Sequence, residues 1–239
     1  TIGAGSGSGE ALATVTVNAT AAGDILMDEI WADTTNSVTD NAMVMTLSAD
    51  GVGSSVTLDD VWNTFGSTTV NISGDQAVDF TRGSGLLTAD DVTITRSGAG
   101  ATTIDAIDAT DALNVTNNGT GTLTITTSDA EGDTVATSTS GALAFTSTST
   151  VNVTATGADG ADTLVATGTT AAGSTHTLSG NGGNDIITGG AGNDTLNGGS
   201  GNDTITAAAG VDTIDAGAGN DTIAMAGNLT AADTLVGGD

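Results

Sequence analysis

The sequence predicts an all-β protein built largely as a parallel β-solenoid, and three observations support this prediction. Thr and Val, which favour pleated backbone, are abundant, whereas Lys is absent and Arg occurs only twice. Short runs of alternating polar and apolar residues recur along the chain, separated by Gly, Asn, Asp and Ser. The last third repeats one glycine- and aspartate-rich pattern every nine residues. We therefore expect short stacked strands, arranged in three units.

The first predicted unit is a β-rich domain over residues 1–88. Its alternating runs, typical of half-buried strands, lie at 11–17, 42–47, 54–58, 68–73 and 76–80. Residues 23–41 lack this alternation, and we expect a long loop or a short helix there. Residues 58–66 are expected to form one helical turn. Both a solenoid and a β-sandwich are compatible with this unit. We place the aromatic residues of this segment, Trp62 and Phe65, in the core, with a partner surface as the alternative.

The second predicted unit, residues 89–156, is a solenoid-like segment without a clear calcium motif. Runs of four to six strand-forming residues recur roughly every ten residues, divided by Gly, Asn, Asp and Ser. A short strand followed by a tight turn, repeated without helices, is typical of a parallel β-solenoid. A β-sandwich with short hairpins is the alternative. The near absence of aromatic residues favours stacked coils with small side chains.

The third predicted unit, residues 157–239, carries a nonapeptide with the pattern Gly-Gly-x-Gly-x-Asp-x-aliphatic-x. Five consecutive copies occupy residues 180–224, with an isolated copy at 157–165 and a degenerate copy at 229–236. The aspartates of the five copies are Asp185, Asp194, Asp203, Asp212 and Asp221. The aliphatic residue two positions after each aspartate is expected to point into the coil. The closing residues 235–239 look like the start of a further copy, so we expect the array to continue beyond this segment.

This nonapeptide resembles the RTX (repeats-in-toxin) calcium-binding repeat. The resemblance implies a β-roll in which two nonapeptides form one coil and calcium ions bind between the loops of successive coils. It therefore implies that Asp185 stacks on Asp203, Asp203 on Asp221, and Asp194 on Asp212, with at least three ions between them. The pair Asp194–Asp212 departs most from the pattern, because Ala207 and Ala208 replace both leading glycines of its second copy.

The chemistry of the repeat agrees with this resemblance. Calcium takes six to eight oxygen ligands from carboxylates and carbonyls, and glycine allows the turns that direct carbonyls inward. Carboxylates stacked ~4.8 Å apart would repel each other without a cation between them. The predicted calcium-binding residues are Gly157, Gly160, Asp162, Gly180, Gly182, Gly183, Asp185, Gly189, Gly190, Gly192, Asp194, Gly198, Gly199, Gly201, Asp203, Gly210, Asp212, Gly217, Gly219 and Asp221.

Other acidic groups are candidates for extra calcium sites or for solvated acidic turns, and the sequence leaves both interpretations open. They are Asp105, Asp108 and Asp111; Asp129, Glu131 and Asp133; Asp24, Asp28 and Glu29; and the pairs Asp59–Asp60 and Asp90–Asp91.

Charge and composition exclude several classes of function. The 29 acidic residues against two arginines give a net charge of −27, which argues against nucleic acid or an anionic membrane as a partner. There is no cysteine, and no apolar run approaches the ~18 residues of a membrane helix. The chain has no His-Glu-x-x-His motif and only one histidine, His176, so we expect no enzymatic site. We expect His176 to be a solvated loop residue, next to a bulge within residues 171–180.

These features together predict a secreted, calcium-binding structural protein at the cell surface. The composition is similar to that of bacterial surface-layer proteins, which implies self-assembly into a lattice or filament and a cell-surface polysaccharide as a further partner. The alternative is the stalk or export tail of an adhesin, toxin or hydrolase exported by type I secretion.

Overall fold

A computed structural model describes residues 2–3, 14–20, 23–31, 42–63, 66–80, 87–127, 134–148, 152–168, 175–226 and 229–238. Every regular element within these ranges is a β-strand. The same ranges contain no helix that could cross a membrane.

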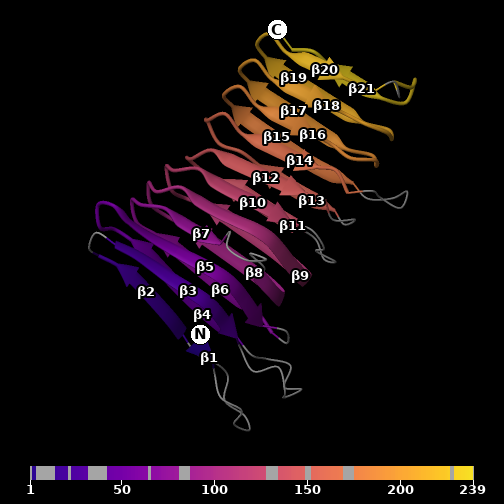
Figure 1. Cartoon of the computed structure of the whole chain (residues 1–239). Coiled ribbons are helices and arrows are strands. Elements are labelled where there is room, and N and C mark those ends of the chain that lie inside the picture. The colour runs from indigo at the N-terminus through magenta and orange to yellow at the C-terminus, as the bar shows by residue number, and fades with distance from the viewer. Residues whose placement is uncertain are drawn as a thin grey trace.

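The strands form two parallel ladders that run the length of the molecule (Figure 1). The first ladder contains β2 (Thr14–Ala19), β4 (Met43–Ala49), β6 (Thr68–Ser73), β8 (Leu87–Arg96), the second half of β9 (Thr102–Asn117), β11 (Thr134–Ser138), β13 (Val153–Thr156), β15 (His176–Gly182), β17 (Thr195–Ser200), β19 (Thr213–Ala218) and β21 (Thr234–Val236). The second contains β1 (Ile2–Gly3), β3 (Gly23–Trp31), β5 (Ser54–Asn63), β7 (Val78–Phe80), the first half of β9, β10 (Leu123–Thr127), β12 (Leu143–Ser147), β14 (Thr163–Ala166), β16 (Ile186–Thr188), β18 (Thr204–Thr206) and β20 (Thr222–Ala224).

Outside β5, β8 and β9, successive strands alternate between the ladders, so a coil contributes one strand to each. The long strands connect the ladders, because β5 pairs with both β7 and β8, and β9 pairs with strands of both ladders. All the ladder pairings of the described residues are parallel, from β1–β3 to β19–β21. A β-sandwich would require antiparallel strands. The predicted solenoid is therefore confirmed, and the sandwich alternative for the first two units is wrong. The pairing continues across residues 88/89 and 156/157, and the division into three units stays a prediction of the sequence.

Two segments of the first unit are strands where the sequence predicted otherwise. Residues 23–31 form β3 rather than a loop or helix, and the predicted helical turn at 58–66 belongs largely to β5. In β5, Val56, Leu58 and Val61 are all fully buried. The three-residue step from Leu58 to Val61 occurs where β5 changes partner from β7 to β8, and this step imitates helical spacing. Residues 32–41 and 64–65 lie outside the described residues.

The core consists of apolar columns, mostly aliphatic, stacked along the solenoid axis. One column is Val15, Met45, Val70, Ile94, Val115, Ala136, Ala155, Leu178, Leu196 and Ile214. The facing column is Phe80, Ile104, Ile125, Phe145, Leu164, Ile187, Ile205 and the partly buried Ile223. Burial of one such aliphatic side chain contributes about 1.5–3 kcal/mol. Phe80 and Phe145 are buried in this core, whereas the side chains of Trp31, Trp62 and Phe65 lie outside the described part.

The coils become shorter towards the repeat. Thr14 pairs with Val44, so a coil takes 30 residues there, whereas Thr195 pairs with Thr213, so a coil takes 18 residues in the repeat. Two strands and two tight loops fill this shorter coil. The loops therefore lie directly above one another, and they carry the aspartates.

Candidate calcium sites in the repeat loops

Each nonapeptide contributes a short strand with one side chain inside and its neighbours outside. Ile187, Leu196, Ile205 and Ile214 are fully buried, as predicted, and the threonines that precede the last three of them are exposed. The aspartate two positions earlier also lies inside the coil. Asp162, Asp185, Asp194, Asp203 and Asp212 are each only 1% exposed. The sequence pattern therefore places one carboxylate per nonapeptide within the solenoid wall.

The carboxylates on one side of the roll form a first column. The backbone N–H of Asp162 donates to Oδ1 of Asp185 at 2.8 Å, and that of Asp185 to Oδ1 of Asp203 at 2.8 Å. Asp203 donates in the same way to Asp221 at 2.9 Å. The expected stacking of Asp185 on Asp203 and of Asp203 on Asp221 is present in the structure, and Asp162 from the isolated copy joins the same column.

A second column lies on the opposite side of the roll. The N–H of Asp194 donates to Oδ1 of Asp212 at 3.0 Å, and the N–H of Asp212 donates to Oδ1 of Asp233 at 2.9 Å. The expected pair Asp194–Asp212 is therefore stacked despite the alanines in its second copy. Asp233, from the degenerate copy, extends this column by one step.

The second oxygen of most of these carboxylates is buried and unpaired. Within the described residues, Oδ2 of Asp185, Asp194, Asp203 and Asp221 has no hydrogen-bond partner. Asp162, at the start of the first column, differs because its Oδ2 accepts a hydrogen bond from the N–H of Ala158 at 2.8 Å. A buried carboxylate oxygen without a partner is costly, so these atoms indicate that a cation completes the loops.

Glycine makes room for this oxygen at the start of each loop. A Cβ on Gly180 would lie 2.0 Å from Oδ2 of Asp185 and 2.7 Å from the carbonyl oxygen of Gly198 in the next coil. A Cβ on Gly198 would lie 2.4 Å from both Oδ2 of Asp203 and the carbonyl oxygen of Ala216. Because no Cβ is present, a carboxylate of one coil and a carbonyl of the next face the same space.

Burial makes the ionised carboxylates unfavourable in the absence of a cation. It raises the pKa of Asp185 to about 6, an effect that the N–H of Asp162 opposes and the charges of Asp162 and Asp203 reinforce. Burial likewise raises the pKa of Asp194 to about 6, opposed by the N–H of His176 and reinforced by the charge of Asp212. At neutral pH both groups are ionised, so the folded loops carry uncompensated negative charge.

The chemistry of these loops fits a hard cation such as calcium. The carboxylate of Asp185 and the carbonyl of Gly198 face one interval, and the carboxylate of Asp203 and the carbonyl of Ala216 face the next. Calcium takes such mixed carboxylate and carbonyl oxygens. No three His, Cys, Asp or Glu side chains converge as a metal-binding group in the described ranges, so the ligands would be mainly backbone oxygens.

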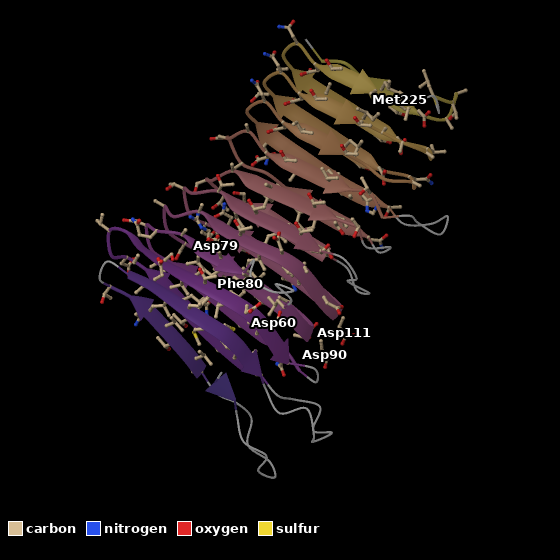
Figure 2. All side chains as sticks on the ribbon, viewed as in Figure 1. Asp60, Asp79, Phe80, Asp90, Asp111 and Met225 are labelled. Atoms are coloured by element: carbon tan, nitrogen blue, oxygen red, sulfur yellow. The ribbon has the colours of Figure 1, made fainter. Side chains whose placement is uncertain are left out.

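The other predicted acidic clusters do not converge within the described residues. Asp105 accepts a hydrogen bond from Thr126 Oγ1 at 3.4 Å, and Asp24 accepts one from Ser55 Oγ at 2.7 Å. Figure 2 shows Asp60, Asp90 and Asp111 on coils that precede the repeat. Asp129, Glu131, Asp133 and the side chains of Asp28 and Glu29 lie outside the described part.

The expectation that His176 is a solvated loop residue is wrong. His176 begins β15, is 1% exposed, and its Nδ1 accepts a hydrogen bond from the N–H of Val153 at 3.3 Å. Burial lowers the pKa of its imidazole. The sequence contained evidence for this burial, because His176 occupies the aspartate position of a nonapeptide. It lies nine residues before Asp185, and Leu178 occupies the aliphatic position. Residues 171–174 of the predicted bulge lie outside the described residues.

A polar stack that sequence reasoning missed precedes the first aspartate column. Arg96 is 1% exposed, and its Nη1 donates to Oδ1 of Asn117 at 3.1 Å and to the carbonyl of Gly121 at 3.0 Å. Asn117 in turn donates to Oγ of Ser138 at 3.2 Å. These residues occupy one register position on β8, β9 and β11. Hydrogen bonds between side chains therefore fill the loop corner in these coils.

The fold and the loops define a calcium-type β-roll at the end of a longer parallel solenoid. Residues 177–205 and 189–223 match the family model described as the RTX calcium-binding nonapeptide repeat, in four copies. These coils are thus RTX repeats, and the RTX resemblance seen in the sequence is confirmed for this segment, whereas the surface-layer type stays a prediction. The match covers the repeat coils and not the coils before them. No curated protein and no solved structure matches the chain. RTX repeats are typical of secreted proteins that bind calcium outside the cell, and their β-rolls are typically structural.

Proposed function

We propose that this chain is part of a secreted structural protein whose repeat coils fold when they bind calcium. The observation that carries the proposal is the set of buried, unpaired Oδ2 atoms of Asp185, Asp194, Asp203 and Asp221. Where free calcium is scarce, as inside a cell, these carboxylates oppose folding. Where it is abundant, as outside a cell, ions bind the folded coils only and draw the equilibrium to the folded state.

The cost of burying an ionised carboxylate and the stabilisation by one bound calcium ion are comparable in energy. A pKa of about 6 in place of 3.8 corresponds to a penalty of about 3 kcal/mol for Asp185 at neutral pH. One ion at a hundredfold excess over its Kd contributes about 2.7 kcal/mol to the folded state. Three ions, in the intervals Asp185–Asp203, Asp203–Asp221 and Asp194–Asp212, would contribute about 8 kcal/mol at that excess, which exceeds the combined penalty of about 6 kcal/mol for Asp185 and Asp194.

We further propose that the folded protein assembles with copies of itself into a surface-layer lattice or a filament. Support comes from the elongated stack of coils and from carboxylates exposed along it, such as Asp91, Asp111, Asp159 and Asp215. With a net charge of −27, neighbouring molecules repel each other unless cations intervene. Calcium that bridges exposed carboxylates of two molecules supplies that attraction.

The test is a calcium titration of chelated protein, followed by circular dichroism and light scattering together. The proposal predicts a transition to β-structure and then growth in particle size. A matched pair of variants separates the two steps: Asp203→Asn should weaken the transition, whereas Asp159→Asn, an exposed position, should leave it unchanged.

Two other outcomes are informative. A transition that ends in a lasting monomer would contradict self-assembly and favour a stalk or export tail, which RTX repeats in secreted proteins also form. A chain that is fully folded in chelator and does not respond to calcium would contradict calcium-linked folding itself.

A further inference from the structure

The second aspartate column does not begin with an aspartate. One coil before Asp194, the equivalent position is His176, and its backbone N–H donates to Oδ1 of Asp194 at 2.9 Å. This is the bond that Asp194 makes to Asp212 one coil later. The Nδ1 atom of His176 accepts from the N–H of Val153, as Oδ1 of each aspartate accepts from the preceding coil. His176 therefore continues the column geometrically with a different side chain.

The hydrogen bond from Val153 determines where the imidazole carries its proton. A backbone N–H can only donate, so Nδ1 must be the unprotonated nitrogen. In the neutral ring the proton is then on Nε2. His176 thus presents an N–H group where Asp185, Asp194 and Asp203 present a negative oxygen.

Nε2 and two carbonyl oxygens of the loop border one space beside Gly190. Nε2 is buried and has no partner among the described residues. The position of a Cβ on Gly190 would be 3.4 Å from Nε2, 2.7 Å from the carbonyl oxygen of Ala166 and 3.5 Å from that of Gly168. Carbonyls that would otherwise be available to a cation therefore share their space with a hydrogen-bond donor.

We propose that His176 closes the second calcium column: the interval between the coils of His176 and Asp194 holds no calcium, and the imidazole N–H takes the place of the ion. A hard cation needs oxygen ligands, and this position supplies an N–H in place of a carboxylate oxygen. The partial positive charge of the N–H repels a cation from the space that it shares with the carbonyls. The first repeat coil can then join the preceding solenoid without metal. Calcium binding on this side begins one step later, between Asp194 and Asp212. This inference rests on the proposed calcium binding of the repeats.

The test compares His176→Asp and His176→Asn with the wild-type chain by calcium titration and native mass spectrometry. His176→Asp restores a carboxylate at the equivalent position, so it should bind one ion more than the wild type. It should also be less folded in chelator, because it buries one more unpaired carboxylate. His176→Asn is neutral and should bind the same number of ions as the wild type.

Three outcomes would overturn the inference. Equal ion numbers in wild type and a folded His176→Asp would show that the residue does not control this interval. One ion fewer in His176→Asn would show that His176 itself holds calcium; this arm decides even if His176→Asp does not fold. A wild type that binds no calcium would overturn the proposed function as well, whereas the first two outcomes leave that function intact.

Discussion

Replacing Asp185 with Asn should stabilise the calcium-free fold and weaken its response to calcium. In the folded state burial raises the pKa of this carboxyl to about 6, from an ordinary value of 3.8. Each pKa unit corresponds to about 1.4 kcal/mol, so the ionised group costs the fold about 3 kcal/mol at pH 7.5. Asn retains the Oδ1 acceptor for the N–H of Asp162 but carries no charge. The variant should therefore gain up to about 3 kcal/mol in chelator.

The sign of the pH dependence follows from the raised pKa. The folded state binds a proton more tightly than the unfolded state, so the penalty is fully present above pH 6. It declines as the pH falls through 6 and disappears below the ordinary value of 3.8. At pH 5 about half of it remains, and the advantage of Asp185→Asn over the wild type should shrink accordingly.

The assay is folding in chelator, driven by trimethylamine oxide and followed by circular dichroism at pH 7.5 and pH 5.0. Asp159→Asn is the matched control, because it removes one charge from an exposed position in the same unit. Asp185→Asn should fold at a lower osmolyte concentration than both the control and the wild type at pH 7.5. The reasoning is refuted if Asp185→Asn folds no more readily than Asp159→Asn, or if its advantage is the same at both pH values.

Three further changes test other parts of the structure. Gly180→Ala should weaken calcium binding about 10–100-fold, because its Cβ would lie 2.0 Å from Oδ2 of Asp185. Gly237→Ala is the control, because no atom lies within 4 Å of a Cβ at that position. Equal calcium affinities of the two variants would contradict this prediction. Asn117→Ala should lower the free energy of unfolding by about 2–4 kcal/mol in calcium and in chelator alike, since its hydrogen bonds to Arg96 and Ser138 involve no aspartate. Thermal melting measures this, and a loss of stability confined to calcium-containing buffer would argue against a metal-free stack. Leu196→Ala, at a fully buried position, should lower the free energy of unfolding by about 2–5 kcal/mol and raise the calcium concentration at the midpoint of folding. An unchanged midpoint would show that the apolar core column contributes little to stability.

The repeat was predictable because its residues and its structure share one period. Each nonapeptide contains one aspartate and one aliphatic residue in fixed phase, so the stacking of Asp185 on Asp203 and the burial of Ile205 follow from the sequence. The parallel solenoid before it was predictable in class, because small side chains and short strands suit stacked coils. Both predictions depend on sequence patterns that recur along the chain, and such recurrence is visible in a single sequence.

The parts that the sequence did not reveal depend on contacts between coils of unequal length. The step from Leu58 to Val61 reflects a strand that changes partner, which local periodicity cannot distinguish from a helical turn. Arg96 and Asn117 meet only because β8 and β9 pair in one register, 21 residues apart. The burial of His176 was missed because the repeat is recognised by its aspartate, and His176 occupies the aspartate position with a different side chain. The pairing of strands, rather than composition, determines what these residues do.

Hydrogen exchange of backbone amides, with and without calcium, tests the central claim most directly. The claim is that calcium folds the repeat coils, whereas the coils before them form no aspartate column among their described residues and fold on their apolar core. We predict that amides of β16 to β20 exchange quickly in chelator and become protected in calcium. Amides of β8 to β11 should be protected in both conditions. Equal protection of β16 to β20 in chelator and in calcium would contradict the account.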